Sequence, residues 1–99
     1  MAVAVFSHPN CALHDAGPGH PEAPGRIVAV MEALGALPGV ALHTATPAAP
    51  DVLLTVHTPE HLQLLRDTHA AGGGRLDPDT VMNAHSWDAM LAATGAVLE

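Results

Sequence analysis

The chain has 99 residues and a net charge of −7 at neutral pH, with three arginines and no lysine. A nucleic-acid-binding domain needs a clustered basic face that displaces counterions, so we expect no nucleic-acid partner. One cysteine excludes an internal disulfide and a cysteine-rich zinc module. No apolar run is long enough for a membrane span, so we expect a cytoplasmic protein with no membrane partner.

The first half of the chain alternates strand and helix signals. The Val-rich run 2–6 predicts a strand that is buried on both faces, and a loop dense in Gly, Pro and His follows over 7–24. Pro24 then opens a helix that Pro38-Gly39 ends, and residues 40–43 predict a second strand. The apolar positions of this helix recur at helical spacing: Ile27, Val30, Met31 and Leu34.

The second half is mostly helical by pattern. Residues 51–56 fit either a strand or a short helix, whereas Thr58-Pro59-Glu60 combines a hydroxyl cap, a first-turn proline and an acid at the positive end of the dipole. Gly72-Gly73-Gly74-Arg75 predicts a flexible connector. Ser86 can cap a last helix whose inward positions are Met90, Leu91, Thr94 and Val97. The element order fits the edge of an α/β sandwich.

Eight histidines in 99 residues raise the question of a metal site. His8, His14 and His20 recur six residues apart in one loop, and His57 and His61 are four apart. Without a supporting carboxylate set, we favour hydrogen bonds from the loop histidines to backbone groups over a zinc site. A small His-rich metal-binding protein is the weaker alternative. Ser86 lacks the G-x-S-x-G context of a nucleophile.

Three segments resemble the class II histone deacetylases and the bacterial acetylpolyamine amidohydrolases. Residues 8–26, HPNCALHDAGPGHPEAPGR, resemble that family's H-x-x-G-x-G-H-P-E-x-P-x-R loop at the active-site rim. Residues 55–62, TVHTPEHL, resemble the family's segment vH-x-x-x-Y/H-hydrophobic, in which His57, His61 and Leu62 are the matching positions. Residues 76–96 resemble its D-x-D-T, S-x-x-A and A-A-G-A block. The similarity runs in order along nearly the whole chain, and it favours a helix over 51–56.

The resemblance implies an α/β fold, the three-layer α/β/α sandwich of the arginases and deacetylases. Family members are several times longer, and the helical pattern still runs at Glu99, so we expect residues 1–99 to be the N-terminal portion of an incomplete domain. The complete domain would be a zinc-dependent hydrolase of acetylated lysine, acetylated polyamines or similar amides. An acidic chain tolerates such cationic ligands.

The resemblance also implies that this chain alone is inactive. The family's His-His pair and its Tyr are absent from the sequence. We also expect no D-x-H ligand pair, and therefore no catalytic residue and no zinc ligand in this chain; zinc is expected only for the complete domain. The alternative is a truncated fragment or an interaction module without activity of its own.

Four residues take site roles from the resemblance. Asp79 matches the rim acid that grips the backbone amides of the substrate, although Asp77 is a second candidate and either acid could merely cap a turn. Arg26 matches an arginine buried beneath the active site, where it supports the loop; the alternative is an ordinary arginine in solvent at a helix N-terminus. His20 and Glu22 belong to the same support, with Glu22 holding backbone N–H groups. An Ala-rich core with two aromatics predicts marginal stability, aggregation or self-association.

Overall fold

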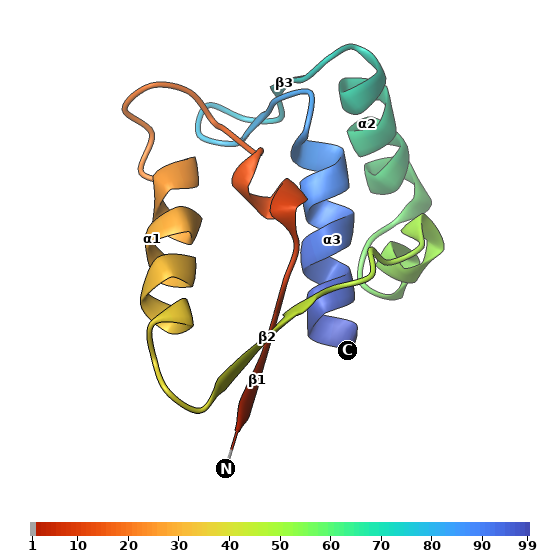
Figure 1. Cartoon of the computed structure of the whole chain (residues 1–99). Coiled ribbons are helices and arrows are strands. Elements are labelled where there is room, and N and C mark those ends of the chain that lie inside the picture. The colour runs from red at the N-terminus through yellow and green to blue at the C-terminus, as the bar shows by residue number, and fades with distance from the viewer. Residues whose placement is uncertain (1) are drawn as a thin grey trace.

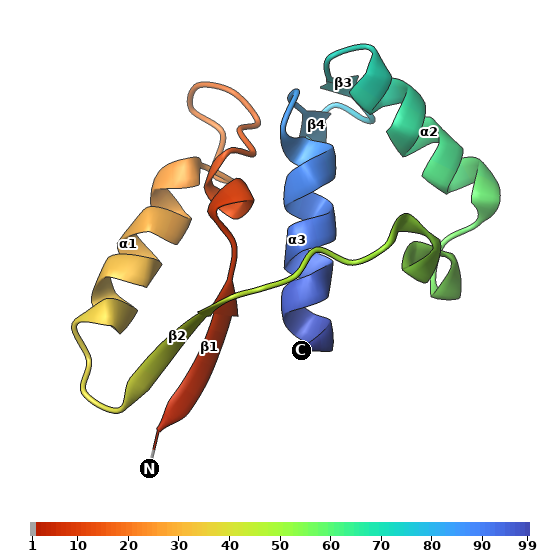
Figure 2. The same cartoon turned by 45° about the vertical axis from the view of Figure 1, so that its right-hand side comes forward.

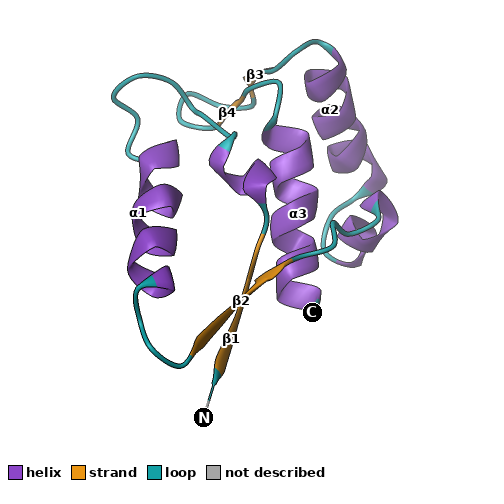
Figure 3. Ribbon diagram, viewed as in Figure 1, coloured by secondary structure: helices purple, strands orange, loops and turns teal. Residues whose placement is uncertain are grey.

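The computed structural model describes residues 2–99. Figure 1 shows the arrangement of its elements, and Figure 3 distinguishes helices from strands. In chain order they are β1 (Val3–Ser7), the 3-10 helix η1 (Pro9–Ala12), α1 (Pro24–Gly35), β2 (Val40–Thr44), the 3-10 helix η2 (Pro50–Thr55), α2 (Pro59–Ala70), β3 (Gly74–Arg75), β4 (Val81–Met82) and α3 (Ser86–Leu98).

A parallel pair of strands forms the middle layer. β1 pairs with β2 so that Val3 lies opposite Val40 and Ser7 opposite Thr44. The chain crosses between the strands through α1, which lies on one side of the pair, while α3 lies on the other (Figures 1 and 2). This helix–sheet–helix order is the predicted layering, and both strands occur within one residue of their predicted positions.

The prediction that the first strand is buried on both faces is wrong for this chain. Val3 is 60% exposed, and no residue of β1 is fully buried. The reason is that β2 is the only strand paired with β1 among residues 2–99. α1 contributes no buried residue either, so its apolar face covers the sheet only in part.

The hydrophobic core lies between η2, α2 and α3 instead of under α1. Its buried members are Leu53, Leu62, Leu65, Met82, Trp87 and Leu91. Trp87 is the one large anchor of this cluster, and the guanidinium of Arg66 lies 5.8 Å from its ring centroid. Such a contact adds a modest cation–π attraction to the burial of the ring.

Local sequence signals explain most helix boundaries. The Thr58 hydroxyl accepts the backbone N–H of His61 at 3.1 Å, so α2 begins where predicted. Residues 51–55 lie in the 3-10 helix η2 and Val56 directly follows it, so the segment is helical, as the resemblance favoured. Ser86 does not cap α3, because it is the first residue of the helix and its hydroxyl bonds elsewhere. Val97, predicted to face inward, is 87% exposed.

The segment 72–75 is not the flexible connector that its glycines predict. Gly74 and Arg75 form β3, which pairs antiparallel with Met82 and Val81 of β4. Gly73 has a φ of +120°, and a Cβ there would lie 2.5 Å from the carbonyl oxygen of Met82, so glycine is required for close approach. The hairpin presents the loop 76–80, which carries Asp77 and Asp79. Within residues 2–99, no helix has the length and apolar character of a membrane span.

Candidate functional site

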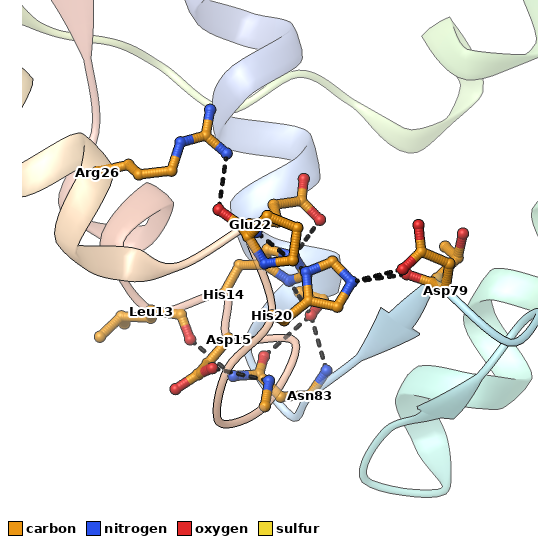
Figure 4. A network of polar contacts seen from close by, with 12 residues as sticks. Leu13, His14, Asp15, His20, Glu22, Arg26, Asp79 and Asn83 are labelled. Atoms are coloured by element: carbon orange, nitrogen blue, oxygen red, sulfur yellow. Dashed lines mark hydrogen bonds and ion pairs between the residues drawn. The ribbon is translucent and has the colours of Figure 1, made fainter.

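Two loops that are far apart in the sequence meet at His20. Its Nε2 lies 2.9 Å from the carbonyl oxygen of Asp79 and 3.1 Å from Oδ1 of the same residue. Its Nδ1 accepts the backbone N–H of Glu22 at 3.0 Å. Figure 4 shows the imidazole between the two acidic residues. His20 therefore joins the loop 13–23 to the loop 76–80.

Asp77 and Asp79 have different environments. The Asp77 carboxylate accepts the backbone N–H groups of Asp79 at 2.8 Å and of Thr80 at 2.7 Å, and the Thr80 hydroxyl at 3.0 Å. These bonds, the one from Asp79 first, hold the pKa of Asp77 below its ordinary value. The Asp79 side chain is 89% exposed, and within residues 2–99 its carboxylate is hydrogen-bonded only to His20, through Oδ1. Asp77 thus closes the turn, and Asp79 presents a carboxylate to solvent.

A second set of hydrogen bonds ties the loop 13–23 to the start of α3. His14 Nδ1 lies 2.6 Å from the hydroxyl oxygen of Ser86. That hydroxyl also accepts the backbone N–H of Asn83 at 2.8 Å and donates to Asn83 Oδ1 at 2.9 Å. The Asn83 amide donates to the carbonyl oxygen of Leu13 at 2.8 Å (Figure 4). The loop is therefore anchored at two consecutive residues.

Ser86 is a structural residue in this network. A hydroxyl offers one hydrogen and two lone pairs, and His14 and Asn83 together engage all three. The residue is also buried. This agrees with the absence of a nucleophile motif around it. Neither Ser86 nor Asn83 was singled out as a loop anchor from the sequence, since nothing in their local pattern points to a loop 70 residues earlier.

Glu22 and Arg26 differ from their expected roles. Among residues 2–99, no backbone N–H donates to the Glu22 carboxylate; its Oε2 lies 3.5 Å from His14 Nε2, an ion pair whenever the ring is protonated. Arg26 is exposed, not buried, and its guanidinium donates one long bond of 3.5 Å to the carbonyl oxygen of Pro21. No residue of α1 is buried, so little of the described part of the chain covers this helix.

Several histidines bond to backbone groups, as favoured above. His8 Nδ1 accepts the backbone N–H of Asn10 at 3.1 Å, and His20 bonds to backbone on both ring nitrogens. His14 differs, because both its contacts are to side chains. His57 and His61 lie close together with ring centroids 4.9 Å apart.

The side chains of residues 2–99 are not arranged to hold a zinc ion. Between residues 2 and 99, no three His, Cys, Asp or Glu side chains converge in an arrangement that could hold a metal. The expectation of no D-x-H spacing is wrong, because Asp67-Thr68-His69 has it. Residues two apart on a helix point about 200° apart. Asp67 accepts from Gln63, whereas His69 stacks on Trp87 with centroids 6.1 Å apart, so the two do not converge.

An apolar cavity of about 390 Å³ lies beside the network. His14, Glu22 and Ser86 supply part of its polar wall. Its apolar lining comes from the hairpin and the two C-terminal helices, and includes Leu65, Leu76, Met82 and Met90. The arrangement offers hydrogen-bond acceptors and a braced loop beside an apolar cavity.

Comparisons with known proteins agree with the resemblance. The model of the histone deacetylase domain matches residues 20–99. The chain is 34% identical over 103 residues to the uncharacterised protein slr0245 of Synechocystis sp. (strain ATCC 27184 / PCC 6803 / Kazusa), with 98% of this chain and 34% of that protein covered. It is also similar to the crystal structure of the HDA15 HD domain, with a TM-score of 0.82, 29% identity, and 95% of this chain and 30% of that one covered.

These matches confirm the α/β deacetylase-like fold, since the likeness to the HDA15 HD domain extends over nearly all of the chain. The chain spans about a third of the length of both relatives. With most of its residues matched by one domain model, this chain belongs to the histone deacetylase family.

Proposed function

We propose that the chain is the N-terminal portion of a longer zinc-dependent deacetylase domain that acts on acetylated lysine, acetylated polyamines or similar amides. The observation that carries this proposal is the match of residues 20–99 to the histone deacetylase domain, together with a likeness that spans about a third of each relative. The net charge of −7 suits a substrate with a cationic chain and disfavours nucleic acid.

Asp79 is the substrate-binding residue in this proposal. Its carboxylate projects into solvent from a turn that Asp77 closes, and an ionised carboxylate can accept two N–H bonds from a substrate backbone. Asp77 is less suited to that role, because its oxygens already accept three hydrogen bonds. The different environments of the two acids support Asp79 as the rim acid.

His20, Glu22 and Arg26 support the loop. His20 connects it to Asp79, and the Glu22 backbone N–H holds the imidazole at 3.0 Å. The Arg26 guanidinium reaches the Pro21 carbonyl oxygen, a contact long enough that its contribution here is small. Support of the loop by Arg26 from a buried position would require further parts of the domain to cover it.

Catalysis and zinc binding would reside in parts of the complete domain other than these residues, because the side chains described above do not converge on a metal. We therefore expect the 99-residue chain alone to be inactive. Its role would be to bind and orient the substrate at the rim.

An interaction module without activity is the second candidate. It is favoured by apolar side chains that remain exposed on α1, on β2 and in the turn between them: Val28, Val30, Leu37 and Leu42. Such a surface would also suit self-association. A cytoplasmic location stays a prediction.

Deacetylation assays separate the two candidates. An acetyl-lysine peptide and N-acetylputrescine would be offered, with zinc, to the whole protein and to residues 1–99 alone. We expect turnover by the whole protein only. If the whole protein is inactive on both substrates while residues 1–99 form a stable dimer, the interaction module is supported and the deacetylase proposal is contradicted.

A further inference from the structure

We propose that His20 is a positioning residue that holds the Asp79 carboxylate in one orientation, and that it does so as the neutral imidazole with its proton on Nε2. This inference rests on the proposed role of Asp79 at the substrate rim. The two residues are 59 positions apart in the chain, so the contact is a product of the tertiary fold.

The hydrogen bonds of His20 select a single protonation state. Nε2 faces two acceptors, the carbonyl oxygen and Oδ1 of Asp79, so it must carry a proton. Nδ1 faces a donor, the backbone N–H of Glu22, so it must carry a lone pair. The neutral Nε2–H tautomer alone satisfies all three contacts. The opposite tautomer would set donor against donor at Glu22.

Asp79 is consequently held at three points. Asp77 Oδ1 accepts its backbone N–H at 2.8 Å, and His20 donates to its carbonyl oxygen and to its Oδ1. The two backbone contacts fix the peptide, and the third restrains the side chain. Oδ2 bonds to none of residues 2–99, and it is left to accept an N–H from a ligand. An acceptor held in advance loses less entropy when the ligand binds.

The loop around His20 is built to keep the ring in place. The His20 side chain is 17% exposed, although the carboxylate that it contacts is 89% exposed. A turn precedes the ring, closed by the bond from the His20 backbone N–H to the carbonyl oxygen of Gly17 at 3.3 Å. Gly17 and Gly19 have φ values of +112° and +77°, which glycine adopts without strain. The imidazole thus approaches the acid from a braced, partly covered position.

The test compares His20→Leu with His20→Gln in the whole protein, with deacetylation kinetics and thermal melting measured on each. Leu removes the donor, whereas Gln places an amide N–H near the position of Nε2. We expect His20→Leu to lower kcat/KM about two- to tenfold, mainly through KM, the range for loss of one or two net hydrogen bonds. His20→Gln should recover most of that loss. A merely structural role would change the melting temperature and leave KM unchanged.

A double-mutant cycle with Asp79→Ala shows whether His20 acts through Asp79. We expect the effect of His20→Leu on KM to be much smaller in the Asp79→Ala background. Equal effects in both backgrounds, or wild-type kinetics for His20→Leu where Asp79→Ala is impaired, would overturn the positioning role and leave the rim acid in place.

A measurement that does not depend on catalysis distinguishes failure of the positioning role of His20 from failure of the rim role of Asp79. In protein labelled with 15N-histidine, the His20 ring should show the Nε2–H tautomer at neutral pH, and Asp79→Ala should alter its nitrogen shifts. If Asp79→Ala leaves both the kinetics and those shifts unchanged, the contact between the His20 ring and the Asp79 carboxylate is contradicted. If the shifts change and the kinetics do not, the rim role of Asp79 fails, and the positioning role fails with it.

Discussion

The hydroxyl of Ser86, the first residue of α3, lies 2.6 Å from Nδ1 of His14, a loop residue 72 positions earlier in the chain. With the bond from Asn83 to the carbonyl oxygen of Leu13, this contact fixes the loop 13–23 against the helix. The loop 13–23 thus connects this buried hydroxyl to His20, which in turn bonds to Asp79.

Replacing Ser86 by Ala should destabilise the protein by about 1–3 kcal/mol, because His14 and Asn83 each lose a hydrogen-bond partner in a buried setting. The measurement is the free energy of unfolding from urea titration. Ser7→Ala is the control, since the Ser7 hydroxyl makes no hydrogen bond within residues 2–99. Equal stability of the Ser86→Ala variant and the wild type would contradict the anchoring role.

Gly95→Ala should destabilise the protein by about 2–3 kcal/mol, the upper part of the range for overpacking. A Cβ at this position of α3 would overlap the carbonyl oxygen of Thr46, and the backbone N–H of Ala48 donates to Leu91 beside it at 2.9 Å. The loop 45–49 therefore packs directly on the helix backbone.

Gly25→Ala is the matched control for this substitution. Gly25 lies in the first turn of α1, and a Cβ there meets nothing within 4 Å. Gly25→Ala should leave the free energy of unfolding unchanged or raise it by up to about 1 kcal/mol, because alanine has a higher helix propensity than glycine. Thermal melts of the two variants test the contrast, and similar melting temperatures would show that α3 and the loop are not in close contact.

The turn of the loop 76–80 should loosen in acid. Hydrogen bonds from Asp79 and Thr80 lower the pKa of Asp77 from its ordinary value of 3.8. A lowered pKa in the folded state means that the stabilisation is present above the ordinary value and is lost as the pH falls through the folded pKa. In an NMR titration, the amide signals of Asp79 and Thr80 should shift together with the Asp77 carboxyl below pH 3.8.

Asp77→Asn supplies the comparison for that titration, because it cannot ionise. The acid shift of the Thr80 amide, which donates to the Asp77 carboxylate at 2.7 Å, should then be lost or much smaller. A Thr80 amide transition as large in Asp77→Asn as in the wild type would remove Asp77 as the residue that closes the turn.

Helix starts and strands were predictable because they depend on neighbouring residues. Thr58-Pro59-Glu60 contains its own cap, and the Val-rich run of β1 contains its own strand preference. The β3–β4 hairpin was missed because its two-residue strands carry no periodicity, and its glycines are required by an approach to Met82 that local sequence does not reveal.

The sequence predicted which residues belong to the site but not which of them pair with one another. The resemblance brought His20, Glu22 and Asp79 into one list, but the pairing of His20 with Asp79 and of His14 with Ser86 depends on packing over 59 and 72 residues. Burial was the weakest expectation. Arg26 is exposed because burial depends on what surrounds α1, not on the loop motif itself.

Residues 1–99 should bind zinc weakly and below one equivalent, because no three potential ligands converge within the described part of the chain. Isothermal titration calorimetry at neutral pH is the measurement. Tight binding of one zinc per chain, abolished by His14→Ala or His20→Ala, would contradict this expectation and favour a His-rich metal-binding protein.

The most direct test of the rim assignment is the kinetics of Asp79→Ala and Asp77→Ala in the whole protein with an acetylated substrate. Asp79→Ala should lower kcat/KM about ten- to a hundredfold, the loss of a positioning contact of about 1.4–2.8 kcal/mol, with melting temperature and metal content unchanged. Asp77→Ala should act mainly on the stability of the turn. Wild-type kinetics for Asp79→Ala, or a larger loss of kcat/KM for Asp77→Ala in a stably folded protein, would contradict the assignment.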